Sequence, residues 1–189
     1  MSTFRVQQIA VFSVLLGFFT PHVGAADIEA GKNKASMCAG CHGLDGASNN
    51  PMFPRLAGQS AMYLENQLKA FKSGARTSPM MQGMAAGLSD EDMKNLAAYF
   101  ASLPAKSAGG DADLAKQGKE KVAMCLGCHG NDAQGRGQFP RLAGQHPQYL
   151  AKQLNAFKQG ERTGGPMGAM SKNLSAQDIK EISAYLGSL

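Results

Sequence analysis

Two cysteines and a histidine recur in two short motifs, MCAGCHG at residues 37–43 and MCLGCHG at residues 124–130. On one turn of helix, the two thiols of such a motif can reach the two vinyl groups of a porphyrin and form thioethers, while the histidine that follows can bind the iron. C-x-x-C-H is therefore the attachment signature of c-type haem. The residues that would do this chemistry are Cys38, Cys41 and His42 in the first motif and Cys125, Cys128 and His129 in the second.

Two other kinds of site use closely spaced cysteines, and the sequence favours neither. A thioredoxin-like redox pair needs a βαβ context, which the pattern of the chain does not provide. A zinc site would have to combine the cysteines of both motifs, although these belong to separate repeats. All four cysteines lie in the two motifs, so none is left for a disulfide. The sequence therefore predicts two covalently bound haem c groups.

The second axial ligand of each iron decides whether a substrate could reach the metal. Apart from the motif histidines, the chain contains only His22, near the N-terminus, and His146. His146 aligns with Ser60 of the other repeat, which excludes a shared bis-histidine design, and we interpret it as an ordinary turn residue. Methionine is the other common ligand. In the loop before the last helix of each repeat, spacing leaves two matched pairs open, Met81 with Met167 and Met84 with Met170.

One unit is repeated along the chain. FPRLAGQ occurs at residues 53–59 and again at residues 139–145, an offset of 86, and the segments that follow align at the same offset. Residues 104–113, between the copies, are rich in Pro, Gly, Ala and Asp, as expected for a linker. We predict a signal peptide at residues 1–25, a first domain at 27–103, a linker at 104–112 and a second domain at 113–189.

Each repeat is predicted to consist of short helices. Apolar residues recur at helical spacing in residues 63–72. Ser89 with Asp92 resembles a capping box at the start of the last helix, as does Ser175 with Asp178. No alternating strand pattern is present, so the fold class is all-α. Domains of about 80 residues bury little apolar surface alone, and a large apolar cofactor would complete each core.

The N-terminal segment predicts export. Arg5 precedes an apolar stretch at residues 9–19, and small residues then lead to Ala25, as in a cleaved signal peptide. The stretch is shorter than the about 20 apolar residues that span a bilayer. We therefore expect a periplasmic protein, cleaved near Ala25. The formal net charge of +5 falls to +4 without Arg5, which is too mild to indicate nucleic-acid binding.

Each repeat resembles a class I cytochrome c, and the pair resembles the dihaem cytochrome c4 family over essentially the whole mature chain. The matching stretches are CAGCHGLDG, FPRLAGQ twice, YLxxQLxxF twice and MxxMxxxLS twice. The resemblance implies two tandem class I cytochrome c domains. It also implies that the first methionine of each pair is the iron ligand, which gives the ligand sets His42 with Met81 and His129 with Met167.

The resemblance also implies roles for the FPRLAGQ segments. The carbonyls of Pro54 and Pro140 would accept the Nδ1–H of the two motif histidines and orient the rings. Arg55 and Arg141 stand where the family usually has lysine. They would either pair with haem propionates or remain solvated surface charges.

With both axial positions filled, an iron has no room for a substrate, and electron transfer remains as its task. We therefore expect an electron-transfer protein rather than an enzyme. By resemblance, it would carry electrons between a quinol-oxidising complex and a terminal oxidase, with peripheral membrane association left open. The alternatives are a cytochrome subunit of a larger oxidoreductase, such as a flavin-containing sulfide dehydrogenase, and a dihaem peroxidase.

The two domains differ in charge. Residues 27–103 carry seven basic and seven acidic side chains, whereas residues 113–189 carry ten basic and six acidic side chains. Opposite charges steer association between proteins. We therefore predict that an acidic redox partner docks at the second domain.

Overall fold

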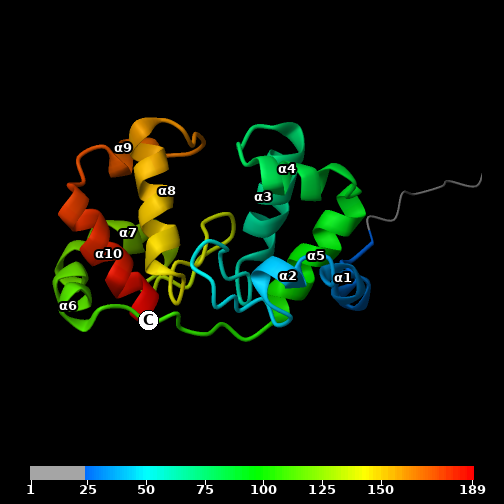
Figure 1. Cartoon of the computed structure of the whole chain (residues 1–189), viewed down its shortest axis with the longest axis horizontal. Helices are drawn as coiled ribbons and strands as arrows, with labels where there is room; N and C mark the ends of the chain where they lie inside the picture. The colour runs from blue at the N-terminus through cyan, green and yellow to red at the C-terminus, as the bar shows by residue number, and fades with distance from the viewer. Residues whose placement is uncertain (1–23) are drawn as a thin grey trace, which may run out of the picture.

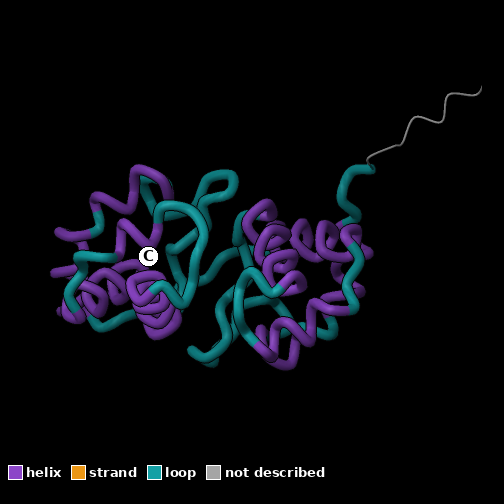
Figure 2. Tube along the Cα trace, turned by 90° about the horizontal axis from the view of Figure 1, so that it is seen from above, coloured by secondary structure: helices purple, strands orange, loops and turns teal. Residues whose placement is uncertain are grey.

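The structure, a computed structural model, describes residues 24–189, which form ten α-helices and no β-strand. Two groups of helices lie side by side, joined by an extended segment (Figure 1). Seen from above, loops gather where the groups meet (Figure 2). The helices are α1 (Ile28–Ala35), α2 (Ala39–His42), α3 (Ala61–Ser73), α4 (Pro79–Ala86), α5 (Asp90–Ser102), α6 (Ala112–Lys121), α7 (Ala123–His129), α8 (Pro147–Gln159), α9 (Met167–Ser171) and α10 (Ala176–Ser188).

The predicted all-α fold is confirmed, with α1–α5 in the first group and α6–α10 in the second. The predicted signal peptide lies almost entirely outside the described residues. The domain boundaries expected from the sequence stay a prediction, although residues 104–111 of the predicted linker lie between α5 and α6.

Polar caps begin the last helix of each domain. The Ser89 hydroxyl accepts a hydrogen bond from the Asp92 amide at 3.0 Å, and the Asp92 carboxylate accepts one from the Ser89 amide at 2.9 Å. Ser175 and Asp178 repeat both bonds at the same distances. Each pair satisfies amides that a helix N-terminus would otherwise leave unbonded. Both capping boxes predicted from the sequence are therefore present.

A glycine lets the first and last helices of each domain cross closely. A Cβ atom added to Gly31 of α1 would lie 2.1 Å from the Asn95 carbonyl oxygen of α5. In the second domain, a Cβ atom on Gly118 of α6 would lie 2.0 Å from the Glu181 carbonyl oxygen of α10. Both distances are far inside van der Waals contact, so any side chain would push these helices apart.

Each domain has its own apolar core on the inner face of its last helix. Met93, Leu96, Ala97 and Phe100 of α5 are buried in the first core, and Ile179, Ile182 and Leu186 of α10 are buried in the second domain. Partly buried Cys38 and Met81 pack against the first core, and Cys125 packs against the second. The haem-attachment motifs are thus built into the cores.

The methionine candidates lie on short helices, which corrects the expectation that they occupy a loop. Met81 and Met84 lie in α4, which begins with Pro79 in its first turn, and Met167 begins α9. Helices of eight and five residues complete too few turns for apolar periodicity to indicate them. Each helix presents its methionine from a defined backbone rather than from an irregular loop.

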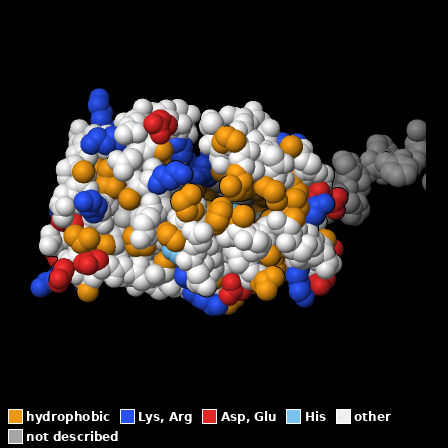
Figure 3. All heavy atoms as spheres, in the orientation of Figure 1, with side chains coloured by type: hydrophobic (Ala, Val, Ile, Leu, Met, Phe, Trp, Pro, Cys, Tyr) orange, Lys and Arg blue, Asp and Glu red, His pale blue; other side chains and the backbone are white. Residues whose placement is uncertain are grey.

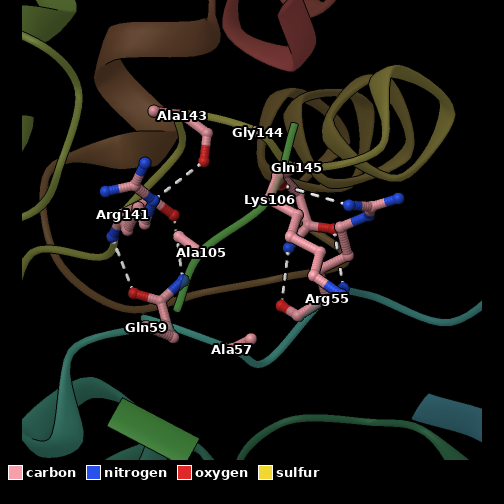
Figure 4. Close-up of a pocket in the computed structure, with 9 residues that line it drawn as sticks. All are labelled: Arg55, Ala57, Gln59, Ala105, Lys106, Arg141, Ala143, Gly144 and Gln145. Atoms are coloured by element: carbon pink, nitrogen blue, oxygen red, sulfur yellow. Dashed lines mark hydrogen bonds between the residues drawn. The ribbon is translucent and has the colours of Figure 1, made fainter. Parts of the chain in front are cut away.

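The two FPRLAGQ segments bind each other where the domains meet. Gln59 donates from Nε2 to the Arg141 carbonyl at 2.9 Å, and its Oε1 accepts from the Arg141 amide at 2.7 Å. Gln145 makes the same two bonds to the backbone of Arg55, both at 2.9 Å (Figure 4). Because each glutamine forms two hydrogen bonds with the backbone of the other FPRLAGQ segment, the two halves of this interface are equivalent.

Candidate haem-binding sites

The four motif cysteines are free thiols at the edges of the two cores. Cys38 and Cys125 are half-buried, whereas Cys41 and Cys128 are exposed. Burial raises the pKa of the Cys38 thiol, and the nearby Cys41 raises it further. Burial also raises the pKa of Cys125. Each motif therefore offers two unpaired thiols, the form needed to make thioether bonds.

The motif histidines are held as neutral imidazoles. In each domain the histidine is buried, and its Nδ1 lies 2.8 Å from a proline carbonyl, that of Pro54 for His42 and that of Pro140 for His129. Burial lowers the pKa of both histidines, and the proline hydrogen bond partly offsets this effect. With Nδ1–H donated to the carbonyl, the Nε2 lone pair is left for a metal.

An aromatic ring supports each imidazole from the residue before the proline. Phe53 meets His42 edge-to-face with ring centroids 6.2 Å apart, and Phe139 meets His129 at the same separation. Two thiols and one oriented neutral imidazole are the donor set that a c-type haem requires. The residues of both motifs thus fit the group that the sequence predicts.

Met81 and Met84 are both half-buried, so burial separates the methionine candidates only in the second domain. Met81 is half-buried and packs against the core that also holds Cys38. Met80, its neighbour, is 58% exposed, and Met170 of the second domain is 37% exposed. Met167 is half-buried at the start of α9.

The guanidinium groups of Arg55 and Arg141 bond backbone carbonyls. Arg55 donates from Nη1 to the carbonyls of Lys106 and Ser107, at 3.1 Å and 3.0 Å, and so fastens the linker to the first domain. Arg141 donates from Nε to the Ala143 carbonyl at 3.0 Å. Figure 4 shows both arginines beside the segment where the linker crosses the interface. The sequence did not indicate this structural role.

His146 has a larger role than the turn residue we expected. It lies at the N-cap of α8 but is only 6% exposed, and its Nε2 lies 2.8 Å from the Ser48 carbonyl of the first domain. Burial lowers the pKa of His146, the Ser48 hydrogen bond raises it, and the nearby Arg55 charge lowers it. Ser60, its counterpart in the first domain, donates from its hydroxyl to the Gly137 carbonyl of the second domain. The bonded residues are 98 and 77 positions apart, so no local pattern could reveal them.

The fold and the motifs define a protein with two c-type cytochrome domains. The sequence model of the family described as cytochrome c matches residues 28–104 and again residues 115–189. Cytochrome c4 of Pseudomonas aeruginosa is 41% identical over 180 residues, an alignment that covers 87% of this chain and 90% of that protein. The chain belongs to the dihaem cytochrome c4 family.

Solved structures agree with this assignment. The crystal structure of reduced recombinant cytochrome c4 from Pseudomonas stutzeri matches with a TM-score of 0.82 and 40% identity, covering 87% of this chain and all of that one. A protein named thiosulfate dehydrogenase electron acceptor, from Stutzerimonas stutzeri, is 40% identical over 179 residues and covers 85% of this chain and 83% of its own length.

The chain binds two haem c groups covalently, through the cysteines of the motifs at 38/41 and 125/128, and is a dihaem electron-transfer cytochrome. Within residues 24–189, no helix is both long enough and apolar enough to cross a membrane.

Proposed function

We propose that this chain is a periplasmic electron carrier between a quinol-oxidising complex and a terminal oxidase, and that it catalyses no reaction of its own. The observation that carries the proposal is that the two domains have matching sets of candidate iron ligands. Each offers one buried imidazole fixed by a proline carbonyl and a half-buried methionine candidate on a short helix. Two closed iron sites would leave outer-sphere electron transfer as the only chemistry.

We assign the ligand sets as His42 with Met81 and His129 with Met167. Met81 supports this choice because it packs against the core that contains Cys38, whereas Met84 does not belong to that cluster. In the second domain, the partial burial of Met167 and the exposure of Met170 favour Met167.

Haem c supplies a one-electron couple between ferric and ferrous iron when it is bound. The protein sets how that couple behaves. The carbonyls of Pro54 and Pro140 hold the imidazole Nδ1–H, which fixes the ring and raises the basicity of Nε2. A thioether sulfur favours the ferrous state and so raises the reduction potential. Burial of both histidines keeps the imidazoles away from bulk water.

Single replacements of the four methionines test the ligand assignment. Met81→Ala and Met167→Ala should each remove about half of the weak sulfur-to-iron absorption band of the ferric protein, because one of two sulfur ligands is lost. Met84→Ala and Met170→Ala are the matched controls and should leave the band unchanged. Loss of the band in a control variant would reverse the assignment for that domain.

Charge supports docking of an acidic partner on the second domain. Its lysines Lys116, Lys119, Lys152 and Lys172 are exposed, and none takes part in an ion pair of the described structure. Charge-steered association weakens as salt screens the charges, with a Debye length of about 8 Å at physiological ionic strength. A rate constant with an acidic partner that stays constant as salt rises would contradict this docking mode.

A second candidate is that the chain serves one dedicated oxidoreductase. A relative named thiosulfate dehydrogenase electron acceptor aligns with most of this chain. The structure of a thiosulfate dehydrogenase, TsdBA of Marichromatium purpuratum, matches with a TM-score of 0.77 and 31% identity over 86% of this chain, but this chain covers only 40% of that one. Copurification of a stoichiometric catalytic subunit from native cells would favour this candidate, whereas a free dihaem protein would favour the carrier.

A further inference from the structure

Two arginines from different domains share the same two glutamine oxygens. Arg76 donates from Nη1 to Gln67 Oε1 at 2.7 Å and from Nη2 to Gln153 Oε1 at 2.9 Å. Arg162 mirrors this arrangement, with Gln153 Oε1 at 2.6 Å and Gln67 Oε1 at 2.9 Å. We call these residues, with the phenols that also accept from them, the arginine cluster: Tyr63, Gln67, Arg76, Tyr149, Gln153 and Arg162.

The arginine cluster contains two like charges and no carboxylate. Both guanidinium groups lie within hydrogen-bonding distance of a single oxygen, so their charges repel each other in a half-buried place. Every ion pair in the described part of the chain uses a lysine. The nearby acidic side chains do not compensate, because Glu65 pairs with Lys69 and Glu161 is exposed without a bond to the cluster. Such a pair of cations calls for an anion that the polypeptide does not provide.

The arginine cluster borders the haem-binding cores. The Arg76 guanidinium lies over the Phe71 ring at 4.6 Å, and Phe71 belongs to the buried core against which Cys38 and Met81 pack. Arg162 lies over Phe157 at 4.5 Å in the same way. Each arginine thus reaches from the aromatic wall of its own domain to the glutamine and the tyrosine of the other domain.

We propose that the arginine cluster binds the propionate carboxylates of both haem c groups, so that one pair of cations serves two redox centres. The inference deepens the proposed carrier function and rests on it. It assigns the propionates to this pair rather than to Arg55 and Arg141, because the two guanidinium groups of the cluster share one acceptor oxygen with no carboxylate bonded to either. Ferric haem carries one positive charge more than ferrous haem, so a shared cation favours the ferrous state of both irons. The reduction potential of each haem therefore depends on the arginine of the other domain as well as on the arginine of its own domain.

Potentiometric titration of holoprotein variants tests this shared site, with the two haems distinguished by their shifted methyl resonances in NMR. Arg76→Gln and Arg162→Gln should each lower the potentials of both haems. The Arg76→Lys variant keeps the charge, so its two reduction potentials should stay close to those of the wild type. This variant can still be measured if Arg76→Gln gives no holoprotein. A shift confined to the haem of the mutated domain would overturn the proposal.

Two further variants distinguish an electrostatic effect of the arginine charges from a purely structural role of the cluster between the domains. Lys119→Gln removes one exposed positive charge from α6, on the outer side of the second domain, and should leave both potentials nearly unchanged. Gln67→Ala removes a shared acceptor but keeps both guanidinium charges, and it should shift the potentials less than Arg76→Gln does. Equal shifts in Gln67→Ala and Arg76→Gln would show that the cluster acts only as an interdomain brace.

A free anion is the other source of the missing negative charge. Raising inorganic phosphate at constant ionic strength should leave both potentials unchanged if propionates occupy the cluster. Potentials that follow the phosphate concentration would overturn the propionate assignment. Unmoved potentials in Arg76→Gln, with the sulfur-to-iron band intact, would refute the cluster alone, whereas a wild type without that band would refute the ligand sets of the proposed function.

Discussion

The two domains have the same internal frame and different surfaces. In each, a histidine lies 2.8 Å from a proline carbonyl, a glycine lies under the helix crossing and a capping box begins the last helix. Four of the exposed large apolar residues of the first domain have polar or proline counterparts in the second. The pairs are Leu44 with Asn131, Met52 with Gln138, Met62 with Gln148 and Met80 with Pro166.

Charge separates the domains in the same sense. The first has no net charge, and the second has a formal charge of +4. Apolar side chains are widely exposed over the first domain, on the right of Figure 3, whereas blue basic side chains are more scattered over the second. The contacts that hold a haem are thus repeated, while the surfaces that could meet partners differ. Two similar redox centres can in this way face partners of different chemistry.

The glycines under the helix crossings should give the largest effects, and equal ones. Gly31→Ala and Gly118→Ala each place a Cβ about 2 Å from a carbonyl oxygen, which must separate two packed helices. We expect a loss of about 3 kcal/mol in the free energy of unfolding for each variant, measured by denaturant titration of holoprotein. Gly83→Ala, with no atom within 4 Å of the new Cβ, is the control. A large loss in one domain only would break the equivalence of the two frames.

The interdomain glutamines should give the next largest effect. Gln59→Ala and Gln145→Ala each remove two hydrogen bonds to the other domain and leave a backbone amide and a carbonyl without a partner. At about 1 kcal/mol for each bond, either change should weaken the interface by about 2 kcal/mol. Faster hydrogen exchange of the Arg141 amide in Gln59→Ala, and of the Arg55 amide in Gln145→Ala, is the readout. Unchanged exchange in both variants would contradict the crossed pairing.

Acid should affect the second domain through an ion-pair network at α6 and α10. Lys121 forms ion pairs with Asp178 and with Glu181, and the Nζ–Oε2 distance of the second pair is 2.6 Å. The Lys121 hydrogen bonds hold the pKa of both carboxyl groups below their usual range. Because the folded-state pKa is depressed, this stabilisation is complete above the unfolded pKa values, near 4, and is lost as the pH falls further.

Lys121→Met tests the acid response by removing the shared cation. We expect the melting temperature of the variant to depend less on pH below about 5 than that of the wild type, because less carboxylate stabilisation remains to be lost. Lys34→Met is the matched change in the first domain, where Lys34 pairs with Asp92 at 3.0 Å and the capping-box amide of Ser89 lowers the pKa of Asp92 most. An identical acid response in wild type and Lys121→Met would contradict the role of the network.

The smallest effect should come from surface charge. The double variant Lys152→Gln with Lys172→Gln should slow electron transfer to an acidic single-copper protein by about two- to fivefold at low salt, because the steering field of the second domain is reduced. Lys32→Gln in the first domain should have almost no effect. Stopped-flow rates at several salt concentrations would check this, and equal slowing in both domains would remove the predicted preference.

The sequence predicted the parts of the fold that depend on near neighbours. The C-x-x-C-H motifs and the capping boxes are local patterns of four or five residues, and the structure contains them. It missed the short methionine helices and the partners of Gln59, Gln145 and His146. Those partners lie 82 to 98 positions away, and they become neighbours only where the two domains meet.

Carbon monoxide binding to the reduced holoprotein tests the central claim most directly, since this ligand needs a free position on ferrous iron. Iron that is closed by His42 and Met81, and by His129 and Met167, should show almost no CO complex at neutral pH. Met81→Ala and Met167→Ala should each open one haem to CO. Rapid, stoichiometric CO binding to either haem of the wild type would contradict the account of this protein as a carrier with two closed sites.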